Sequence, residues 1–241
     1  MPDLHYDHPD LAEIYDLDSG WSVDRDFYLD LASGGPKRVL DLGCGTGLLC
    51  DAYASLGHDV TGVDPAKAML DIAATRPYGS SVTWVEATAQ SFGADKVFDL
   101  IVMTGHAFQV FLDDADILAV FRTMKTHLAE NGVIAFETRN PAIDWGARWQ
   151  GETSLTSGEQ VIRQSRVILQ QDEKVVSFET HYHFPGKTLT SFSKLRFLAR
   201  PEIEDLLREC GLEVKAVYGA WDKQPFDESL SDEMIFIVQS A

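Results

Sequence analysis

The stretch VLDLGCGTG, residues 39–47, constrains the fold of this chain more than any other feature. An apolar run ends in three glycines, Gly43, Gly45 and Gly47, and a helical pattern begins directly after them. Glycines spaced in this way let a strand turn tightly into a helix, and they let the backbone approach a ligand closely. The stretch therefore predicts a buried strand, a ligand-binding turn and a helix, in that order.

The rest of the chain alternates between apolar strands and helical stretches. Alternation of this kind predicts a mostly parallel sheet that is covered by helices on both faces. Near the end, two strands follow one helix without another helix between them, so we expect the last strand to be antiparallel. The expected strands are 38–43, 59–64, 81–87, 97–104, 133–139, 212–219 and 232–239, and the expected helices are 47–57, 65–76, 113–132 and 201–211.

Two segments depart from this alternation. Residues 1–35 are expected to form a helical cap in two pieces, 8–17 and 22–32. Residues 141–199 are expected to form an antiparallel insertion, because 152–199 has strand-like spacing with a turn at 184–187 and no helix. The insertion could cover the substrate site or form a dimer contact. The remaining residues, 36–140 and 200–241, would form the cofactor-binding domain.

Composition excludes several classes of function. The net charge is -18 and the longest basic run is Pro36-Lys37-Arg38, which argues against nucleic acid as a partner. There is no apolar run of membrane-spanning length and no basic, apolar leader at the start, so we expect a cytoplasmic protein. Cys44, Cys50 and Cys210 form no Cys-x-x-Cys pair and are not an even number, so we expect them to be reduced thiols. His181 and His183 could share one side of a strand, but no third ligand is visible and we expect no metal.

The spacing of the glycines indicates which nucleotide would bind at the turn. A dinucleotide fingerprint needs a third glycine at position 48, where this chain has Leu48, and no phosphate-binding Gly-Lys-Ser/Thr follows. Asp64 ends the second expected strand, 21 residues after Gly43, where a carboxylate can accept both ribose hydroxyls. A ribose without a pyrophosphate at a glycine turn points to S-adenosylmethionine.

Together these residues resemble the class I methyltransferase family. VLDLGCGTG is similar to the first motif of that family, VTGVDPAKAML to its second, FDLIVMTGHAF to its fourth, and LAENGVIAFET to its fifth-strand region. The resemblance is strong over residues 36–139 and moderate over 195–239. It implies an α/β fold with a seven-stranded, mostly parallel sheet, helices on both faces and an antiparallel insertion after strand five. It also implies S-adenosylmethionine as the cofactor.

The resemblance carries cofactor contacts onto individual positions. Asp41 and the turn through Gly43, Cys44, Gly45 and Gly47 would line the methionine part, with Thr104 and Gly105 bordering it. Asp64 would bind the ribose and Pro65 would lie against the adenine. Thr88, followed by Ala89, stands where the family usually has an Asp that accepts the adenine amino group, and a hydroxyl accepts more weakly. Tyr15 and Trp21 could close over the cofactor or merely anchor the N-terminal segment.

The acceptor is expected to be a small metabolite that is methylated on nitrogen or oxygen. The stretch MTGHAFQ replaces the (Asp/Asn)-Pro-Pro-(Tyr/Phe) sequence that nucleobase and protein-amide methylases carry after strand four. Transfer would be direct and in line, with His106 as the general base or as a residue that only orients the acceptor. The acceptor pocket is expected to include Phe108, Gln109, Glu137, Arg139 and Asn140.

Several alternatives are open at the level of sequence. Arg139 could bind a substrate carboxylate or form a structural ion pair. Trp145 and Trp149 would share a helical face, in the core or around a substrate. The protein could be a monomer or a homodimer. A non-catalytic protein that keeps the cofactor fold for an assembly or regulatory role is the alternative to an enzyme.

Overall fold

The larger sheet of the protein has seven strands. The computed structural model describes residues 3–158 and 160–241. The strand order is β10-β11-β5-β4-β1-β2-β3, and all pairs are parallel except the two that involve β11. The expected sheet, with its last strand antiparallel, is therefore confirmed. The strands are β1 (Arg38–Leu42), β2 (Asp59–Asp64), β3 (Thr83–Glu86), β4 (Phe98–Met103), β5 (Leu128–Arg139), β10 (Leu212–Tyr218) and β11 (Glu233–Ser240).

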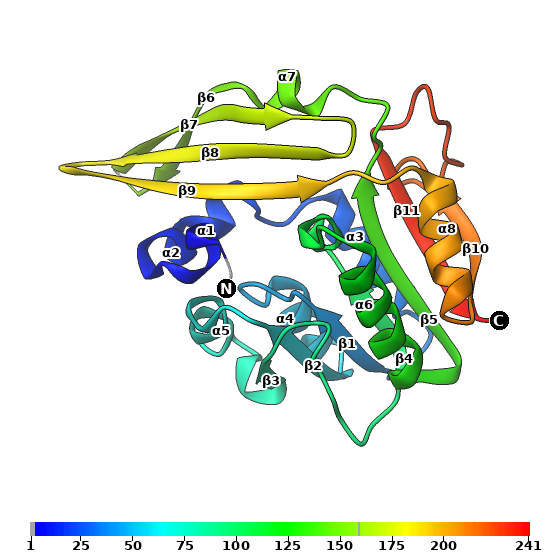
Figure 1. Cartoon of the computed structure of the whole chain (residues 1–241). Helices are drawn as coiled ribbons and strands as arrows, with labels where there is room; N and C mark the ends of the chain where they lie inside the picture. Colours follow the sequence, from blue (N-terminus) through cyan, green and yellow to red (C-terminus); the bar gives the residue numbers. More distant parts are fainter. Residues whose placement is uncertain (1–2, 159) are drawn as a thin grey trace.

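Helices cover both faces of this sheet (Figure 1). Alternate residues of β4 show how the two layers form: Ile101 and Met103 pack in one cluster, Leu100 and Val102 in the other. The first cluster includes side chains of α6 (Asp114–His127) and α8 (Arg200–Glu209). The second includes α3 (Val23–Leu31) and α4 (Leu48–Ser55). This burial on both faces explains why the central strands are almost wholly apolar.

The insertion after β5 is a separate four-stranded antiparallel sheet, as expected. Its order is β6-β7-β8-β9, with strands β6 (Gly151–Ser157), β7 (Gln160–Gln171), β8 (Val175–Phe184) and β9 (Lys187–Arg196). The short helix α7 (Trp145–Trp149) leads into it. In Figure 1 this sheet lies across the top of the molecule, and β5 rises toward it. The carboxyl ends of the parallel strands, where open α/β sheets bind ligands, thus face the insertion.

The N-terminal segment forms three helices where the sequence predicted two pieces. They are α1 (Leu4–Asp7), α2 (Pro9–Asp18) and α3. The break between α1 and α2 falls at His8, whose backbone is extended (φ -85°, ψ 123°). Pro9 causes this break, because a proline disfavours helical geometry in the residue before it.

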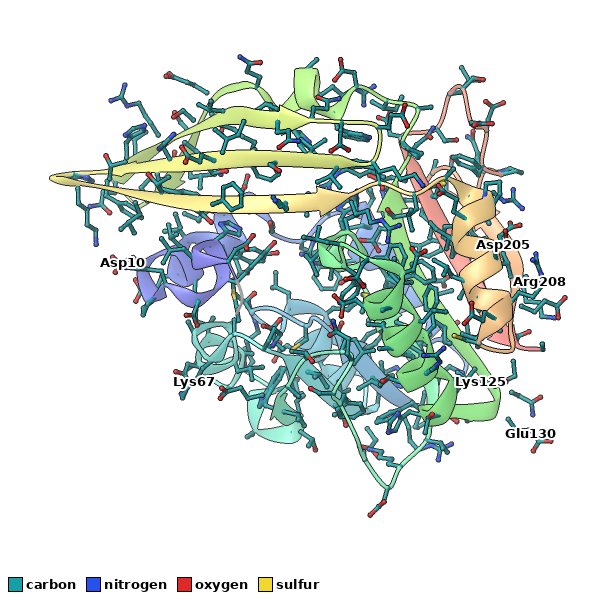
Figure 2. The ribbon with its side chains drawn as sticks, in the orientation of Figure 1. Asp10, Lys67, Lys125, Glu130, Asp205 and Arg208 are labelled. Carbon is teal, nitrogen blue, oxygen red and sulfur yellow. The ribbon has the colours of Figure 1, made fainter. Side chains whose placement is uncertain are left out.

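Helix α2 packs against the insertion, so the N-terminal segment and the insertion meet. Leu11 and Ile14 form one apolar cluster with Leu155, Ile162 and Tyr182 of the insertion. At the outer end of α2, Asp10 forms an ion pair with Lys187 at the start of β9; Figure 2 shows Asp10 at this edge. The two elements together cover the carboxyl edge of the larger sheet.

Residues 113–132, expected to form a helix with a turn, contain α6 and the first residues of β5. The helix ends at His127, and β5 begins at the next residue. The His127 ring hydrogen-bonds the Thr123 carbonyl at 2.8 Å and the Ala94 amide at 3.1 Å, so it ties the helix end to a neighbouring loop. A Cβ atom at Gly132 would lie 2.9 Å from the Phe98 carbonyl oxygen, so β5 approaches β4 closely at that residue.

Two short 3₁₀ helices, η1 (Gly79–Ser81) and η2 (Ala107–Val110), and the helix α5 (Lys67–Ala73) complete the described elements. None of the described helices is long and apolar enough to cross a membrane.

Candidate functional site

The glycine turn connects β1 to α4 as the sequence predicted. Gly43, Gly45 and Gly47 all have positive φ angles, of 79°, 52° and 74°, which other residues rarely adopt. A Cβ atom at Gly47 would lie 2.6 Å from Trp84 and 2.8 Å from the Ala73 side chain, so only glycine fits there. A Cβ atom at Gly45 would instead point toward the Tyr15 ring, at 3.9 Å. The turn is packed on one side and faces Tyr15 on the other.

Asp64 ends β2 beside this turn. Its two carboxylate oxygens accept hydrogen bonds from the Gly45 amide at 2.9 Å and the Ala66 amide at 2.8 Å. Burial raises the pKa of this carboxyl, while these two amides lower it. Each oxygen keeps a second lone pair, which is what a ribose diol would need. Pro65 follows and is exposed.

Two titratable side chains at the turn, Asp41 below it and Cys44 within it, affect what the turn can bind. Asp41 is buried, and burial raises its pKa to about 7. Its Oδ2 accepts from the Cys50 thiol at 3.4 Å, while its Oδ1 has no partner among the described residues. An orphaned buried acceptor next to a glycine turn fits a ligand that brings hydrogen-bond donors. Burial also raises the pKa of the Cys44 thiol to about 11, so Cys44 is protonated and is no nucleophile.

Helix α2 is fastened directly to the glycine turn. Asp16 accepts a hydrogen bond from the Thr46 hydroxyl at 2.6 Å and forms an ion pair with Arg76. Arg76 also donates to the Thr46 carbonyl at 2.6 Å. This network places Tyr15 over the turn. The Tyr15 hydroxyl lies 4.0 Å from the point where a Cβ atom added to Gly105 would stand.

The remaining predicted cofactor residues lie in different surroundings. Thr88 is exposed and hydrogen-bonds Ser91, and Ala89 packs against the core cluster that contains α6. Thr104 accepts from the Ala107 amide at 3.3 Å through its carbonyl. Trp21 is 45% exposed and donates to Asp26 at 2.8 Å. The structure thus brings Tyr15 to the glycine turn but leaves Trp21 on the surface.

His106 has an unusual backbone geometry directly after β4. Its φ is 60°, and in the described part of the chain only Lys223 shares this property among residues other than glycine. The His106 amide donates to Glu137 at 2.7 Å, and the other carboxylate oxygen of Glu137 accepts from the Tyr28 hydroxyl. Glu137 is buried, which raises its pKa. This contact holds His106 in a conformation that costs energy, as residues at functional sites often are.

The side chain of His106 pairs with a second glutamate, Glu233 at the start of β11. The distance from Nε2 to the carboxylate is 2.9 Å. Burial, together with the nearby Arg139, lowers the pKa of His106 to about 4, and burial raises the pKa of Glu233 to about 7. The ring is therefore neutral at pH 7. Its Nδ1 atom has no hydrogen-bond partner in residues 3–158 and 160–241.

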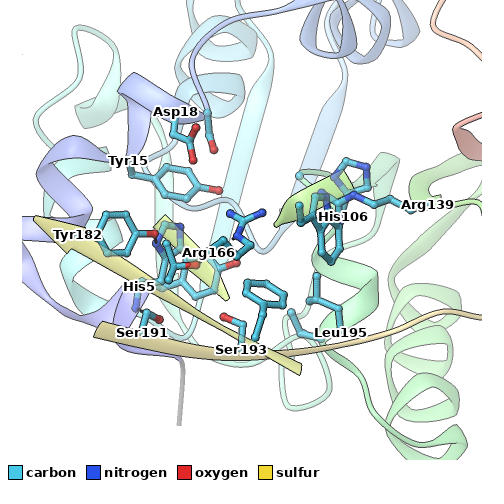
Figure 3. A pocket seen from close by; sticks show the side chains of 17 residues that line it. His5, Tyr15, Asp18, His106, Arg139, Arg166, Tyr182, Ser191, Ser193 and Leu195 are labelled. Atoms are coloured by element: carbon cyan, nitrogen blue, oxygen red, sulfur yellow. Dashed lines mark hydrogen bonds between the residues drawn. The ribbon is translucent and has the colours of Figure 1, made fainter. Parts of the chain in front are cut away.

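One pocket lies between the N-terminal helices, the His106 loop and the insertion. Its volume is about 160 Å³, and Figure 3 shows Tyr15, Arg166 and His106 around it. The aromatic residues His5 and Tyr182 stack on one side, with ring centroids 5.7 Å apart. The pocket is lined by His5, Tyr6, Tyr15, Asp18, Ser19, Gly105, His106, Val110, Arg139, Trp149, Arg166, Phe178, Thr180, Tyr182, Ser191, Ser193 and Leu195.

Four of the five residues expected in the acceptor pocket lie behind its wall. Phe108 packs in the core between Phe121 and Phe136. Gln109 is buried and joins Arg139 to the Arg196 carbonyl. Asn140 binds the carbonyls of Glu228 and Ser231 at 2.8 Å and 2.7 Å, and so positions the loop before β11. Glu137 holds the His106 backbone. Arg139 alone of the five lines the pocket.

Three groups of residues in or beside the pocket were not predicted from the sequence. Glu233 lies far from His106 in the sequence, and only the antiparallel pairing of β11 with β5 brings it opposite Arg139. His5 and Tyr6 come from a helix that was not expected, and Arg166 and Tyr182 come from neighbouring strands of the insertion. The alternating pattern of the insertion could have indicated which of its side chains face inward.

Comparisons with known proteins agree with this geometry. The family model of a methyltransferase domain matches residues 39–132. The cypemycin N-terminal methyltransferase of Streptomyces sp is 26% identical over 207 residues, which cover 84% of this chain and 83% of that protein. Other curated methyltransferases match over about half of their own length.

Solved structures share the fold over nearly the whole chain. A methyltransferase of Clostridium acetobutylicum that depends on S-adenosylmethionine has a TM-score of 0.81 at 18% identity, with 96% of this chain and 98% of that one covered. CalS10, an amino pentose methyltransferase of Micromonospora echinaspora, has a TM-score of 0.72 at 22% identity, with 92% and 93% covered. The chain is thus a class I methyltransferase that depends on S-adenosylmethionine.

Replacing Asp64 tests the ribose contact. We expect Asp64→Ala to weaken binding of S-adenosylhomocysteine by roughly 1–3 kcal/mol, because the ribose loses a charged acceptor and the Gly45 amide loses its partner. Isothermal titration calorimetry measures this change. Asp59→Ala, at the exposed start of the same strand, is the matched control and should leave the affinity unchanged. Equal affinities of Asp64→Ala and the wild type would remove Asp64 from the cofactor site.

Replacing Asp16 tests the attachment of α2 to the turn. We expect Asp16→Asn to raise the KM for S-adenosylmethionine by about 3- to 10-fold, because a hydrogen-bonded charge is lost from the network that holds Tyr15 in place. Steady-state kinetics gives this value. Asp10→Asn removes an exposed ion pair of the same helix and should change the KM little. If the two variants behaved alike, the attachment would not contribute to cofactor binding.

Proposed function

We propose that this enzyme methylates a nitrogen or oxygen atom of a small metabolite by direct in-line transfer. The observation that carries this proposal is the small pocket that reaches from Tyr15 and Gly105 to His106 under the insertion. It adjoins the glycine turn, and it contains a neutral histidine that can accept a proton. A pocket of this size suits a small acceptor better than a macromolecule.

The residues near the turn fit S-adenosylmethionine. Asp41 and the turn through Gly43, Cys44, Gly45 and Gly47 would hold the methionine part, with Thr104 and Gly105 beside it; Asp64, Pro65, Thr88 and Ala89 would hold the adenosine. When bound, the cofactor supplies a methyl group that its sulfonium already activates. The protein then has to position an acceptor atom and exclude water.

His106 is proposed as the general base, with Glu233 positioning it. When Glu233 is ionised, Nε2–H donates to its carboxylate, and this fixes the tautomer in which Nδ1 carries the free lone pair. Nδ1 would take the proton that an amine or hydroxyl loses around transfer. The Glu137 contact to the His106 amide supports this role, because it holds the ring where the pocket begins.

The relatives include methyltransferases that act on nitrogen and others that act on oxygen, such as the ubiquinone biosynthesis O-methyltransferases. One relative that matches over most of this chain is named cypemycin N-terminal methyltransferase, and CalS10 is described as an amino pentose methyltransferase. An ammonium group must lose its proton before it can attack, so an amine acceptor gives His106 a function. The cytoplasmic location and the choice between a monomer and a homodimer stay predictions.

The experiment is a metabolite screen with the purified enzyme and S-adenosylmethionine. Mass spectrometry would look for small amines and alcohols that gain one methyl group. A methylated small amine would support the proposal. Methylation of RNA or of intact proteins, with no small molecule modified, would contradict it.

A further inference from the structure

Two arginines from different sheets face the same pocket. Arg139 ends β5 and Arg166 lies in the middle of β7, and both line the pocket with His106 (Figure 3). Both guanidinium groups pack against the ring of Trp149, at 4.9 Å and 5.7 Å from its centroid. Arg166 also lies 4.9 Å from the centroid of Phe178. Aromatic faces hold a guanidinium flat and leave its N–H edge free.

Neither guanidinium forms an ion pair with a carboxylate in residues 3–158 and 160–241. Arg139 donates to the Gln109 side-chain oxygen at 2.8 Å, and Arg166 donates to the Thr180 hydroxyl at 3.4 Å. Both partners are neutral. Elsewhere in this acidic chain arginines do find carboxylates, as Arg38 does with Asp99 and Arg76 with Asp16. Arg139 therefore forms no structural ion pair within the described residues, which was one of the two roles considered for it from the sequence.

Two positive charges that share a pocket are costly unless their guanidinium edges are paired. Burial lowers the pKa of Arg139 to about 10, and the charge of Arg166 acts in the same direction. The nearby carboxylates of Glu233 and Glu137 oppose this shift without forming an ion pair with Arg139. A buried charge needs a partner or hydrogen bonds to offset lost hydration. Donors that remain free in a binding pocket therefore point to an anionic group of the ligand.

We propose that the methyl acceptor carries a carboxylate and that Arg139 and Arg166 bind it together. This inference rests on the proposed function. The planar fork of each guanidinium matches the two oxygens of a carboxylate. Thr180 and Ser193 also line the pocket, and their hydroxyl groups can add hydrogen-bond donors.

The size of the pocket narrows the acceptor further. The pocket has a volume of about 160 Å³, which suits a small acceptor better than a macromolecule. His106 borders the same pocket, so the carboxylate and the atom to be methylated belong to one small molecule. The acceptor class that fits is a small amino acid.

Asp18 is the other carboxylate to consider. It ends α2 and lines the pocket, but it is exposed and beyond ion-pair distance of both arginines. The alternative role of Arg166 is to attract the Asp18 carboxylate and so hold α2 against the insertion. The two roles differ in what the removal of each side chain does to the acceptor.

The experiment compares acceptors that differ only in the anionic group. Small amino acids would be offered beside their amides and their phosphonate analogues, and methyl transfer from labelled S-adenosylmethionine would be measured. We expect the wild type to prefer the carboxylate. We expect Arg166→Gln to lower kcat/KM for the carboxylate by about 10- to 100-fold and for the amide by little, so that the preference is lost. Binding of S-adenosylhomocysteine should be unchanged, which shows that the variant is folded.

Three further variants make the comparison sharp. Arg166→Lys keeps the charge without the fork, and we expect it to restore part of the preference. Arg163→Gln, an exposed arginine of the same strand, should behave as the wild type. Asp18→Asn should keep the preference, and a loss equal to that of Arg166→Gln would assign Arg166 to Asp18 and overturn the inference.

Other results would also overturn it. Equal use of amide and carboxylate by the wild type would remove the carboxylate from recognition, while the methyl transfer itself would uphold the proposed function. A preference for the phosphonate would assign the arginines to a phosphate group. Failure to bind S-adenosylhomocysteine, with no acceptor methylated, would instead overturn the proposed function and the inference with it.

Discussion

Replacing residues 152–199 by a short linker is expected to abolish methyl transfer while some binding of S-adenosylhomocysteine remains. The insertion supplies Arg166, Phe178, Thr180 and Tyr182 to the pocket, so its loss removes one wall and admits water. The glycine turn and Asp64 belong to the larger sheet, whose strand pairing does not involve the insertion. Turnover assays and calorimetry on the same preparation separate the two effects.

A control for this deletion is Lys187→Gln, at the outer end of β9. It breaks the exposed ion pair with Asp10 and leaves the pocket wall intact, so turnover should stay near that of the wild type. Normal turnover of the deletion variant would show that the acceptor binds elsewhere.

His106→Ala is expected to lower turnover by roughly 10²-fold or more, with little change in cofactor affinity. The reason is that the base and the free Nδ1 atom are lost while the glycine turn is untouched. Steady-state kinetics and calorimetry with S-adenosylhomocysteine measure the two quantities. A variant that keeps wild-type turnover from about pH 6 to about pH 9 would reduce His106 to a wall residue, because no base would then be missing at any pH.

The pH dependence follows from the His106–Glu233 pair. The pKa of Glu233 is raised to about 7 and that of His106 is lowered to about 4, so below about pH 7 the pair holds a proton on the glutamate. A protonated Glu233 no longer accepts from Nε2–H, and the base loses its orientation. Turnover should therefore rise as the pH rises toward about 7 and level off above it. Glu233→Gln should remove this rise, and an unchanged pH profile would exclude Glu233 from the mechanism.

The sheet, and the placement of the glycine turn beside Asp64, could be predicted because local patterns determine them. The strand from 38, the glycines of the turn and Asp64 lie within one short βαβ segment, where spacing alone fixes their relation. The antiparallel direction of the last strand followed from the missing helix before it. The insertion was recognisable from its change of period from helical to alternating.

The acceptor half could not be predicted to the same depth, because long-range register determines it. Glu233 reaches His106 only through the pairing of β11 with β5, and Arg166 reaches Arg139 only because the insertion folds over the sheet. Phe108 and Gln109 follow His106 in sequence, yet η2 turns them into the core. Closeness to His106 in the sequence therefore does not predict closeness to the pocket once the chain has left β4.

Calorimetric titration of the whole protein with S-adenosylhomocysteine, and separately with NAD, tests the assignment of the glycine turn and Asp64 to an S-adenosyl ligand. This assignment predicts one S-adenosylhomocysteine site per chain, a higher melting temperature in the presence of that ligand, and no heat of binding for NAD. Binding of NAD without binding of S-adenosylhomocysteine would contradict it.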